Sequence, residues 1–401
     1  MTKKDDVTVD FDHHSSAISV DPYATWTDLR SRCPVAWTKA HDGYWILTAF
    51  AEVYQATRDD DTFRCAPSVG IPSYGVDGQI PLDTDPPMTQ KYRRILQQQF
   101  SPAAAAEAEP VVRQIANELV DGFIERGECD FITDLTTPVP ARFILRILGF
   151  GEERWVEFCE WVHNIVHNVT NDPESALEGA VALYGAIIEL IEERRTSGLR
   201  DDIVSQLLRS ELDGQPLEDD VITSYMTLLI FGGLDTTSSA VGNALVWLDR
   251  QPELRRQLLD RPELIPAAVE EFLRIDAPVQ GLGRTLSRDI EMAGCPMKAG
   301  DRVLLSWASA NRDPAEFENP DTVDFERLNN RHLTFGVGLH RCLGSNYGRT
   351  MFRIMLETIL ARMPDFELVD DPDQHRFADI GVVYGHTHLP ARFTPGRKLG
   401  V

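Results

Sequence analysis

Apolar residues recur every three to four positions over long stretches of the chain, which is the spacing that one buried face of an α-helix produces. We expect helices over six such stretches: Ala106–Phe123, Trp155–Val169, Pro173–Arg195, Asp219–Arg250, Pro262–Ile275 and Cys342–Met363. Strand-like runs are short and cover Tyr44–Thr48, Arg302–Ser306 and Gly381–Tyr384. The pattern predicts a mainly α protein with small β-sheets at its edge.

Two long segments interrupt this pattern. Cys65–Pro87 is rich in Gly, Pro and Asp, and Asn311–Gly338 is rich in Asn, Asp, Pro and Arg. Loops of this length inside a compact chain are usually functional. The chain has no Gly/Ser-rich linker, low-complexity tract or fixed-period repeat. We therefore expect a polar N-terminal extension over residues 1–20 and one large helical domain over residues 21–401.

Composition narrows the class of protein. The 401 residues carry a formal net charge of −24, which repels the phosphates of nucleic acids. The first residues are polar and acidic and lack the apolar core of a signal peptide, and the most apolar stretch, Met226–Phe231, is too short to span a bilayer. Six widely spaced cysteines fit a reduced compartment. We expect a cytoplasmic protein that binds neither nucleic acid nor membrane.

One cysteine has unusual neighbours. Cys342 lies near the end of a glycine-rich loop, Phe335–Gly344, that leads into an apolar-periodic helix. The helix dipole and the cation of Arg341 favour a thiolate, glycines let the backbone approach a flat partner closely, and the ring of Phe335 can cover the sulfur. These features suit an axial metal ligand in a cofactor pocket, whereas a lone cysteine is more commonly a buried structural residue.

The loop has the spacing F-x-x-G-x-x-x-C-x-G, and it resembles the haem-ligand signature of the cytochrome P450 family. With four specified positions at fixed spacing, the match outweighs the structural alternative. The resemblance implies the cytochrome P450 fold and a haem b (iron protoporphyrin IX) whose iron is bound by Cys342. It places three further residues of the loop against the cofactor: Phe335, Gly336 and Gly344.

A second match lies within the long helical stretch Asp219–Arg250. Two glycines in a helix interior cost about 1 kcal/mol each relative to alanine, so Gly232 and Gly233 need a reason, and a weak, kinked helix is the ordinary one. The segment also resembles the family's G-G-x-D-T sequence. The resemblance implies that Gly232 leaves room for the cofactor beside the helix. It also implies that Thr236 holds bound oxygen with its water and that Asp235 relays protons.

Glu271 and Arg274 form an E-x-x-R pattern, and residues three apart share a helix face and can bridge. Such pairs are usually solvated surface, but the position before the cysteine loop resembles the family's structural E-x-x-R, which binds an arginine of the later loop. The best match for that third residue is Arg327. We interpret the trio as serving folding rather than catalysis.

The segment Asp85–Arg94 resembles the D-P-P segment that enters a helix in bacterial members. Many members have His at the position of Thr89, so this chain departs from the pattern and the role of Thr89 stays open. Arg93 keeps its expected place and can pair with a haem propionate, as arginine does with carboxylates. Arg284 and His340 match two further propionate contacts, with ordinary surface charge as the alternative for each residue.

The resemblance extends from about residue 21 to residue 393 and implies a monooxygenase. Such an enzyme inserts one oxygen atom of O2 into a small-to-medium hydrophobic substrate, terpenoid- or aromatic-like, by hydroxylation or epoxidation. No segment for a flavin or an iron–sulfur cluster is left over, so we expect a separate ferredoxin and its reductase to supply electrons. A haem-thiolate peroxygenase or isomerase and a non-catalytic haem sensor are the alternatives, and Asp235 with Thr236 argues against both. The predicted substrate pocket includes Leu228, Leu229, Val279, Gln280 and Val383.

Overall fold

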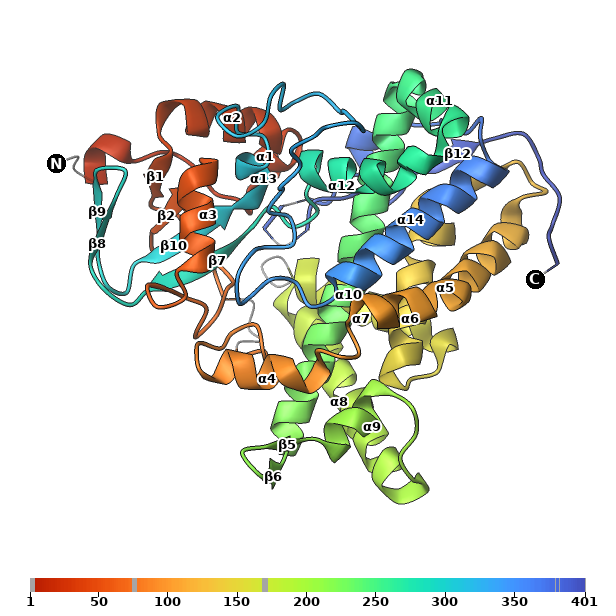
Figure 1. Ribbon diagram of the computed structural model, residues 1–401, viewed down its shortest axis with the longest axis horizontal. Helices are drawn as coiled ribbons and strands as arrows, with labels where there is room; N and C mark the ends of the chain where they lie inside the picture. The colour runs from red at the N-terminus through yellow and green to blue at the C-terminus, as the bar shows by residue number, and fades with distance from the viewer. Residues whose placement is uncertain (1–3, 74–77, 168–171, 379, 382, 401) are drawn as a thin grey trace. The chain divides into compact units, whose positions relative to one another are not determined.

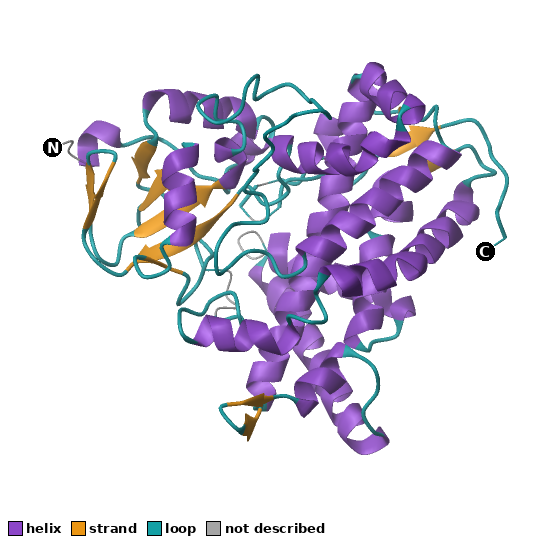
Figure 2. Cartoon of the chain, viewed as in Figure 1, coloured by secondary structure: helices purple, strands orange, loops and turns teal. Residues whose placement is uncertain are grey.

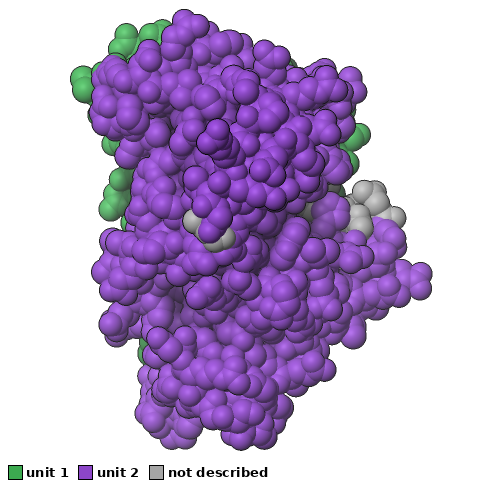
Figure 3. Space-filling view, turned by 90° about the vertical axis from the view of Figure 1, so that its right-hand side faces the viewer, with its two compact units in different colours: residues 1–93, 270–342, 377–384 green, residues 94–269, 343–376, 385–401 purple. Residues whose placement is uncertain are grey.

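The computed structural model describes residues 4–73, 78–167, 172–378, 380–381 and 383–400. The chain forms two compact units (Figure 3). Unit 1 comprises residues 1–93, 270–342 and 377–384, and unit 2 comprises residues 94–269, 343–376 and 385–401. Each unit is thus assembled from segments far apart in the sequence. Among the described helices, none combines the length and the hydropathy needed to cross a bilayer.

A five-stranded sheet is the centre of unit 1. Its strands, in spatial order, are β1 (Val35–Thr38), β2 (Tyr44–Leu47), β10 (Arg302–Ser306), β7 (Gly281–Leu286) and β3 (Phe63–Arg64). β10 runs parallel to β2 and antiparallel to β7, with Val303 opposite Arg284. Because side chains alternate along a strand, Val303 and Leu305 join one buried cluster while Leu304 joins another. Both faces of the sheet are therefore buried.

Short elements surround this sheet. The backbone N–H of Val9 donates to the carbonyl of Trp37 at 2.8 Å, and Phe11 is buried, so the first described residues pack against β1. α13 contacts α2 and α3. These elements are η1 (Lys4–Val7), α1 (Ser16–Ser19), α2 (Pro22–Arg32), α3 (Phe50–Arg58), β8 (Ile290–Met292), β9 (Cys295–Met297) and α13 (Trp307–Ala310).

Unit 2 is mainly helical. Its longest helix, α10 (Asp219–Arg250), contacts α6, α8 and α14, and α14 lies alongside α5 (Figure 1). A three-stranded sheet has the order β11 (Glu367–Leu368), β12 (Pro390–Arg392), β4 (Glu128–Asp130). The other helices are α5 (Pro102–Phe123), α6 (Pro138–Leu148), α7 (Trp155–His167), α8 (Pro173–Ser197), α9 (Ile203–Arg209), α11 (Pro252–Asp260) and α14 (Ser345–Arg362). The smaller elements are η2 (Ile132–Thr136), η3 (Glu152–Arg154), β5 (Glu211–Leu212), β6 (Gln215–Pro216), η4 (Pro262–Leu264) and η5 (Pro372–His375).

Helix starts in unit 2 have local causes. The side chains of Ser101, Asp172 and Asp202 accept a hydrogen bond from a backbone N–H in the first turn of α5, α8 and α9. These caps satisfy donors that have no partner inside the helix. α6 ends at Gly149, whose φ of +107° suits a residue without Cβ. Two helices cross the boundary between the units along the chain: α4 (Met88–Leu96) and α12 (Ile265–Ile275).

The predicted class, mainly α with small sheets, is confirmed (Figure 2). All six predicted helices are present, although η4 replaces the first turn of the one expected from Pro262 and α7 is described only as far as His167. The strand predicted over Gly381–Tyr384 is wrong for residues 381, 383 and 384, which are not in a strand. Val382 lies outside the described residues. Val383 and Tyr384 are buried in a loop, and the N–H of Tyr384 donates to the carbonyl of Pro278 at 2.6 Å. Their apolar character reflects burial rather than strand pairing.

Candidate functional site

Two glycines and a backbone hydrogen bond shape the loop before Cys342. Gly336 and Gly338 have φ angles of +63° and +81°, in the left-handed region that side chains disfavour. The N–H of Cys342 donates to the carbonyl of Phe335 at 2.7 Å and closes the loop. Cys342 is exposed, and Gly344 is the residue that caps the start of α14. The loop therefore presents an accessible thiol just before a helix N-terminus, where a thiolate is stabilised.

Three basic side chains of unit 1 gather near this loop. Arg93 donates from Nη2 to the carbonyl of Arg341 at 2.6 Å, and Arg284 is buried on β7. Burial, and then the charges of Arg284 and Arg93, lower the pKa of His340 to about 3. Burial also lowers the pKa of Arg93, against a smaller opposing effect of the Cys342 charge. The charges of Arg284 and Arg93 thus act on His340 together with its burial.

The two guanidinium groups lack an acidic partner in the described part of the chain. Arg284 donates to the carbonyl of Gly283 at 2.7 Å and Arg93 to that of Arg341, and neither forms an ion pair there with Asp or Glu. The guanidinium of Arg284 is attracted to the Asp60 carboxylate without forming an ion pair, so it can still bind a further anion. The arrangement thus fits a ligand that brings carboxylates to the neighbourhood of Cys342.

In unit 2, the middle of α10 has an open turn. Gly232 is exposed, and no described side chain or neighbouring segment lies within 4 Å of the position that its Cβ would take. The hydroxyl of Thr236 donates to the carbonyl of Gly232 at 2.9 Å, a back-bond that tends to bend a helix. Asp235 is half-buried. Burial, and to a smaller extent the charge of Asp235, raises the pKa of the Cys159 thiol on α7. An acid and an alcohol therefore adjoin a turn that a ligand can approach.

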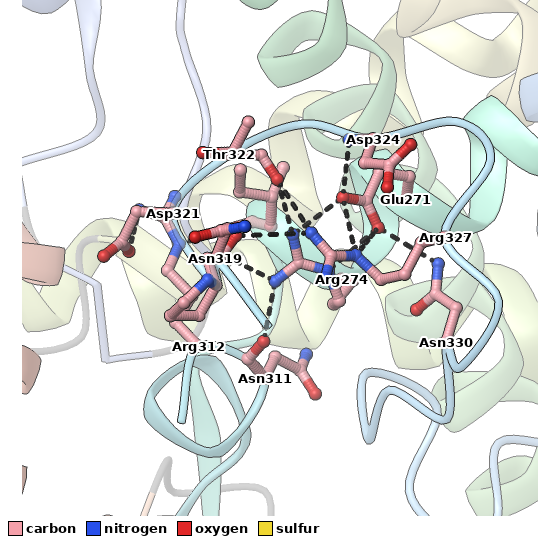
Figure 4. A network of polar contacts seen from close by, with 12 residues as sticks. Glu271, Arg274, Asn311, Arg312, Asn319, Asp321, Thr322, Asp324, Arg327 and Asn330 are labelled. Carbon is pink, nitrogen blue, oxygen red and sulfur yellow. Dashed lines mark hydrogen bonds and ion pairs between the residues drawn. The ribbon is translucent and has the colours of Figure 1, made fainter. Parts of the chain in front are cut away.

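The predicted E-x-x-R trio is brought together in unit 1 (Figure 4). Glu271 and Arg274 are fully buried, and Arg274 donates from Nε and Nη2 to the two carboxylate oxygens of Glu271 at 2.8 and 2.7 Å. The Nε of Arg327 lies 3.1 Å from both oxygens. One carboxylate thus binds two guanidinium groups.

The same trio fixes the irregular segment Asn311–Gly338. Arg274 donates from Nη1 to the backbone carbonyls of Asn311 and Pro320 at 2.9 and 2.7 Å, while the N–H of Asp324 and the side-chain amide of Asn330 donate to Glu271. These partners lie along the loop that leads to the cysteine (Figure 4). The contacts are structural and tie the loop to α12.

Thr89, at the position where many relatives carry His, is buried at the start of α4. Its hydroxyl donates to the carbonyl of Thr84 at 2.7 Å and lies 3.0 Å from the hydroxyl of Thr84. Thr89 therefore closes the turn that precedes the helix carrying Arg93.

The predicted pocket residues differ in their surroundings. Leu228 and Leu229 are half-buried on α10, one turn before Gly232, and Val279 is half-buried against the core of unit 1. Val383 is buried. Gln280 is fully engaged: it accepts from the indole of Trp26 at 2.9 Å and donates to Tyr23 and to the carbonyl of Ala277. Its amide thus serves packing of unit 1.

No sequence motif marks Trp307, yet its position stands out in the structure. Its side chain is buried, and its indole Nε1 has no hydrogen-bond partner among the described residues. The only sequence signal is a tryptophan directly after a buried strand.

Comparisons with known proteins agree on one family. The profile of the family described as Cytochrome P450 matches residues 141–380. Cytochrome P450 130 of Mycobacterium tuberculosis (strain ATCC 25618 / H37Rv) is 35% identical over 369 residues, which are 87% of this chain and 90% of that protein. The Steroid C26-monooxygenase of the same strain is 31% identical over 381 residues, 94% of this chain and 95% of that protein. The crystal structure of CYP109E1 from Bacillus megaterium in complex with testosterone matches with a TM-score of 0.87 and 27% identity, covering 95% of this chain and 100% of that one.

Haem b is the cofactor of this family. It offers one axial position to a thiolate and carries carboxylate side chains. The accessible thiol of Cys342 and the basic groups without an acidic partner fit both features. With a family profile over more than half of its length and relatives above 30% identity, this chain belongs to the cytochrome P450 family and is a haem b-dependent monooxygenase.

Proposed function

We propose that this protein inserts one oxygen atom of O2 into a small-to-medium hydrophobic substrate, terpenoid- or aromatic-like, by hydroxylation or epoxidation. A separate ferredoxin with its reductase supplies the electrons, and the protein works in the cytoplasm. The apolar character of Leu228, Leu229 and Val279 supports the substrate class. One relative is named a steroid monooxygenase and one similar structure contains testosterone, so a steroid is the first larger ligand to test beside terpenoids and aromatics.

In this proposal the loop of unit 1 holds the cofactor. Cys342 binds the iron, and a thiolate-bound haem supplies electron density that favours O–O cleavage. The exposure of Cys342 and the guanidinium of Arg93 beside it, which donates to the carbonyl of Arg341, support this role. The propionates are bound by Arg93, Arg284 and His340, and the loop that lies against the porphyrin is shaped by Phe335, Gly336 and Gly344.

The open turn of α10 carries the proposal. The exposed Gly232 leaves room beside the helix, and the hydroxyl of Thr236 sits one turn later on the carbonyl of Gly232. We infer that this hydroxyl holds a water at the turn and that the carboxylate of Asp235 moves protons to it. A reaction that starts from O2 takes up two protons from outside with its two electrons, whereas hydrogen peroxide already carries both protons. The acid–alcohol pair therefore favours the O2-dependent reaction.

The electron donor docks on the side of the cysteine loop. Arg341 is exposed there and offers a positive charge to an acidic partner. The docking contribution is thus assigned to Arg341.

The test measures product, reductant consumption and peroxide in the same ferredoxin-supported reaction. A red-shifted Soret band of the reduced protein with carbon monoxide, absent from Cys342→Ala, first verifies thiolate ligation. Terpenoid, aromatic and steroid ligands are then screened by the spin-state shift of the ferric protein. We expect Thr236→Ala to consume reductant and release peroxide, with product formation reduced on the order of 10²-fold. Thr236→Ser, which keeps the hydroxyl, should retain most of the product.

Two results would contradict the proposal. Peroxide-supported turnover that exceeds ferredoxin-supported turnover and is unchanged in Thr236→Ala would identify a peroxygenase. Stoichiometric ligand binding without product, with every ligand of the panel, would favour a haem sensor.

A further inference from the structure

Trp307 projects from the same face of the five-stranded sheet as Arg284. Residues directly opposite each other on paired strands share a face, and Val303 of β10 lies opposite Arg284 of β7. Side chains two apart along a strand also share a face. Val303, Leu305 and Trp307 all belong to one buried cluster, so this spacing continues to Trp307, which directly follows β10 as the first residue of α13.

The indole N–H of Trp307 differs from those of Trp26 and Trp45, two other buried tryptophans of this unit. Its side chain is 6% exposed, and Nε1 has no hydrogen-bond partner in the described part of the chain. Trp26 donates from Nε1 to Gln280 at 2.9 Å, and Trp45 donates from Nε1 to Asp301 at 2.8 Å. Buried tryptophan N–H groups usually find an acceptor. An acceptor for Trp307 is therefore expected from outside the described residues.

The indole lies against the cysteine loop. The position that a Cβ on Gly336 would take is 3.9 Å from Cζ2 of Trp307, 3.8 Å from the carbonyl oxygen of His340 and 3.9 Å from Cα of Arg341. The ring thus reaches the part of the loop that carries His340. Arg93 donates to the carbonyl of Arg341 at 2.6 Å, so a second donor lies against the same stretch of the loop.

We propose that the indole N–H of Trp307 donates a hydrogen bond to a haem propionate, as a further donor beside Arg284 and His340. The proposed acceptor is a carboxylate because Arg284, on the same face of the sheet, has the planar fork that matches a carboxylate. This inference depends on the proposed haem site, and it is independent of the proposed substrate and electron donor.

The experiment compares haem loss from ferric holoenzymes to an excess of apomyoglobin. Trp307→Phe keeps an aromatic ring in the core and removes the N–H, and Trp307→Tyr keeps a donor. Trp45→Phe is the matched control, because Trp45 lies in the same buried cluster but has its acceptor within the protein. We expect Trp307→Phe to lose haem about tenfold faster than wild type, as removal of a bond to a charged acceptor should cause. Trp307→Tyr should lose haem more slowly than Trp307→Phe, and Trp45→Phe should match wild type.

The Soret band of the reduced carbon monoxide complex, recorded for each variant, separates the alternatives. An unshifted band with faster haem loss in Trp307→Phe supports the propionate as acceptor. A shifted band with unchanged haem loss would place the N–H on the thiolate and overturn the proposal. The proposal also fails if Trp307→Phe loses haem at the wild-type rate. It fails as well if Trp307→Phe loses haem at the same rate as Trp307→Tyr or as Trp45→Phe. Failure of the haem-thiolate site itself would appear in the wild-type spectrum, before any variant is compared.

Discussion

At the scale of single residues, Glu271 holds the most concentrated set of contacts around the proposed site. Its carboxylate is fully buried and binds two guanidinium groups, a backbone N–H and an amide. A buried ion pair adds little net stability by itself, because desolvation offsets the attraction. Loss of one partner is different, since it leaves the other charge buried without compensation. Removal of Glu271 should therefore cost more stability than the net energy of its ion pairs.

We predict that Glu271→Gln destabilises the protein by about 3–5 kcal/mol, because Arg274 and Arg327 lose their shared counter-charge. Thermal unfolding of the purified holoenzyme and the yield of haem-loaded protein measure this. The control is Asp289→Asn, which removes an exposed partner of Lys298 and should leave both readouts unchanged. A Glu271→Gln holoenzyme that unfolds at the wild-type temperature would show that the network does not anchor the loop.

At the scale of elements, α10 combines two adjacent glycines with different surroundings. A Cβ at Gly232 would meet no described neighbour within 4 Å, whereas a Cβ at Gly233 would lie 2.9 Å from Cγ1 of Ile144 on α6. Gly233 thus allows close packing of α10 against α6. Gly232 has no packing reason, which is what a position reserved for a ligand requires. One glycine serves the fold and the other serves the proposed site.

This difference gives a prediction from two alanine variants. Gly232→Ala should raise helix stability by up to about 1 kcal/mol while lowering product formation, because the methyl group enters the open turn. Gly233→Ala should lower stability by about 1–3 kcal/mol through overpacking. Denaturant unfolding and product assays on the same holoenzymes measure both effects.

Relief of the clash is the control for Gly233. Gly233→Ala combined with Ile144→Ala should recover part of the stability relative to Ile144→Ala alone, since the two substitutions share one contact. The assignment of roles fails if Gly232→Ala destabilises and Gly233→Ala does not.

Elements with a strong local signal were predictable from the sequence, and elements that depend on distant partners were not. The bounds of α10 and β10 follow from periodicity and turn residues. Helices α2, α3, α6 and α11 carry shorter patterns and were missed. The apolar run around Val383 was read as a strand, because burial in a loop gives the same pattern as burial in a sheet. The glycine loop and the G-G-x-D-T segment were recognisable, but the orphan N–H of Trp307 emerges only when the pairing of β10 with β7 is known.

At the scale of the whole molecule, both units are closed by segments from the far ends of the chain. β2 pairs in parallel with β10, and β4 pairs with β12. No local pattern specifies such partners, so the division into these units could not be read from the sequence. The last of these segments brings His386 into the core of unit 2. His386 is 2% exposed, and neither ring nitrogen has a hydrogen-bond partner among the described residues.

This buried imidazole predicts how stability depends on pH. Burial, with a smaller effect of the Arg376 charge, lowers the pKa of His386 well below its usual 6.5, while Asp373 opposes the shift. The folded protein therefore keeps His386 neutral, and the unfolded chain takes up a proton below pH 6.5. Because the unfolded state then binds more protons, the free energy of unfolding falls as the pH drops below 6.5, by up to about 1.4 kcal/mol per pH unit.

Denaturant unfolding of the holoenzyme at pH 7.5, 6.5 and 5.5 should show most of this residue's loss, about 1 kcal/mol, between the two lower values and about a third of that between the two higher ones. His386→Gln should flatten the profile over that interval, because a glutamine takes up no proton in either state. The matched control is His388→Gln, two residues away, where the imidazole is exposed and bonded to Asp130 at 2.7 Å. If His386→Gln keeps the full wild-type slope, acid unfolding must arise from other groups, and the buried imidazole is then a packing residue without influence on the pH range in which the protein is stable.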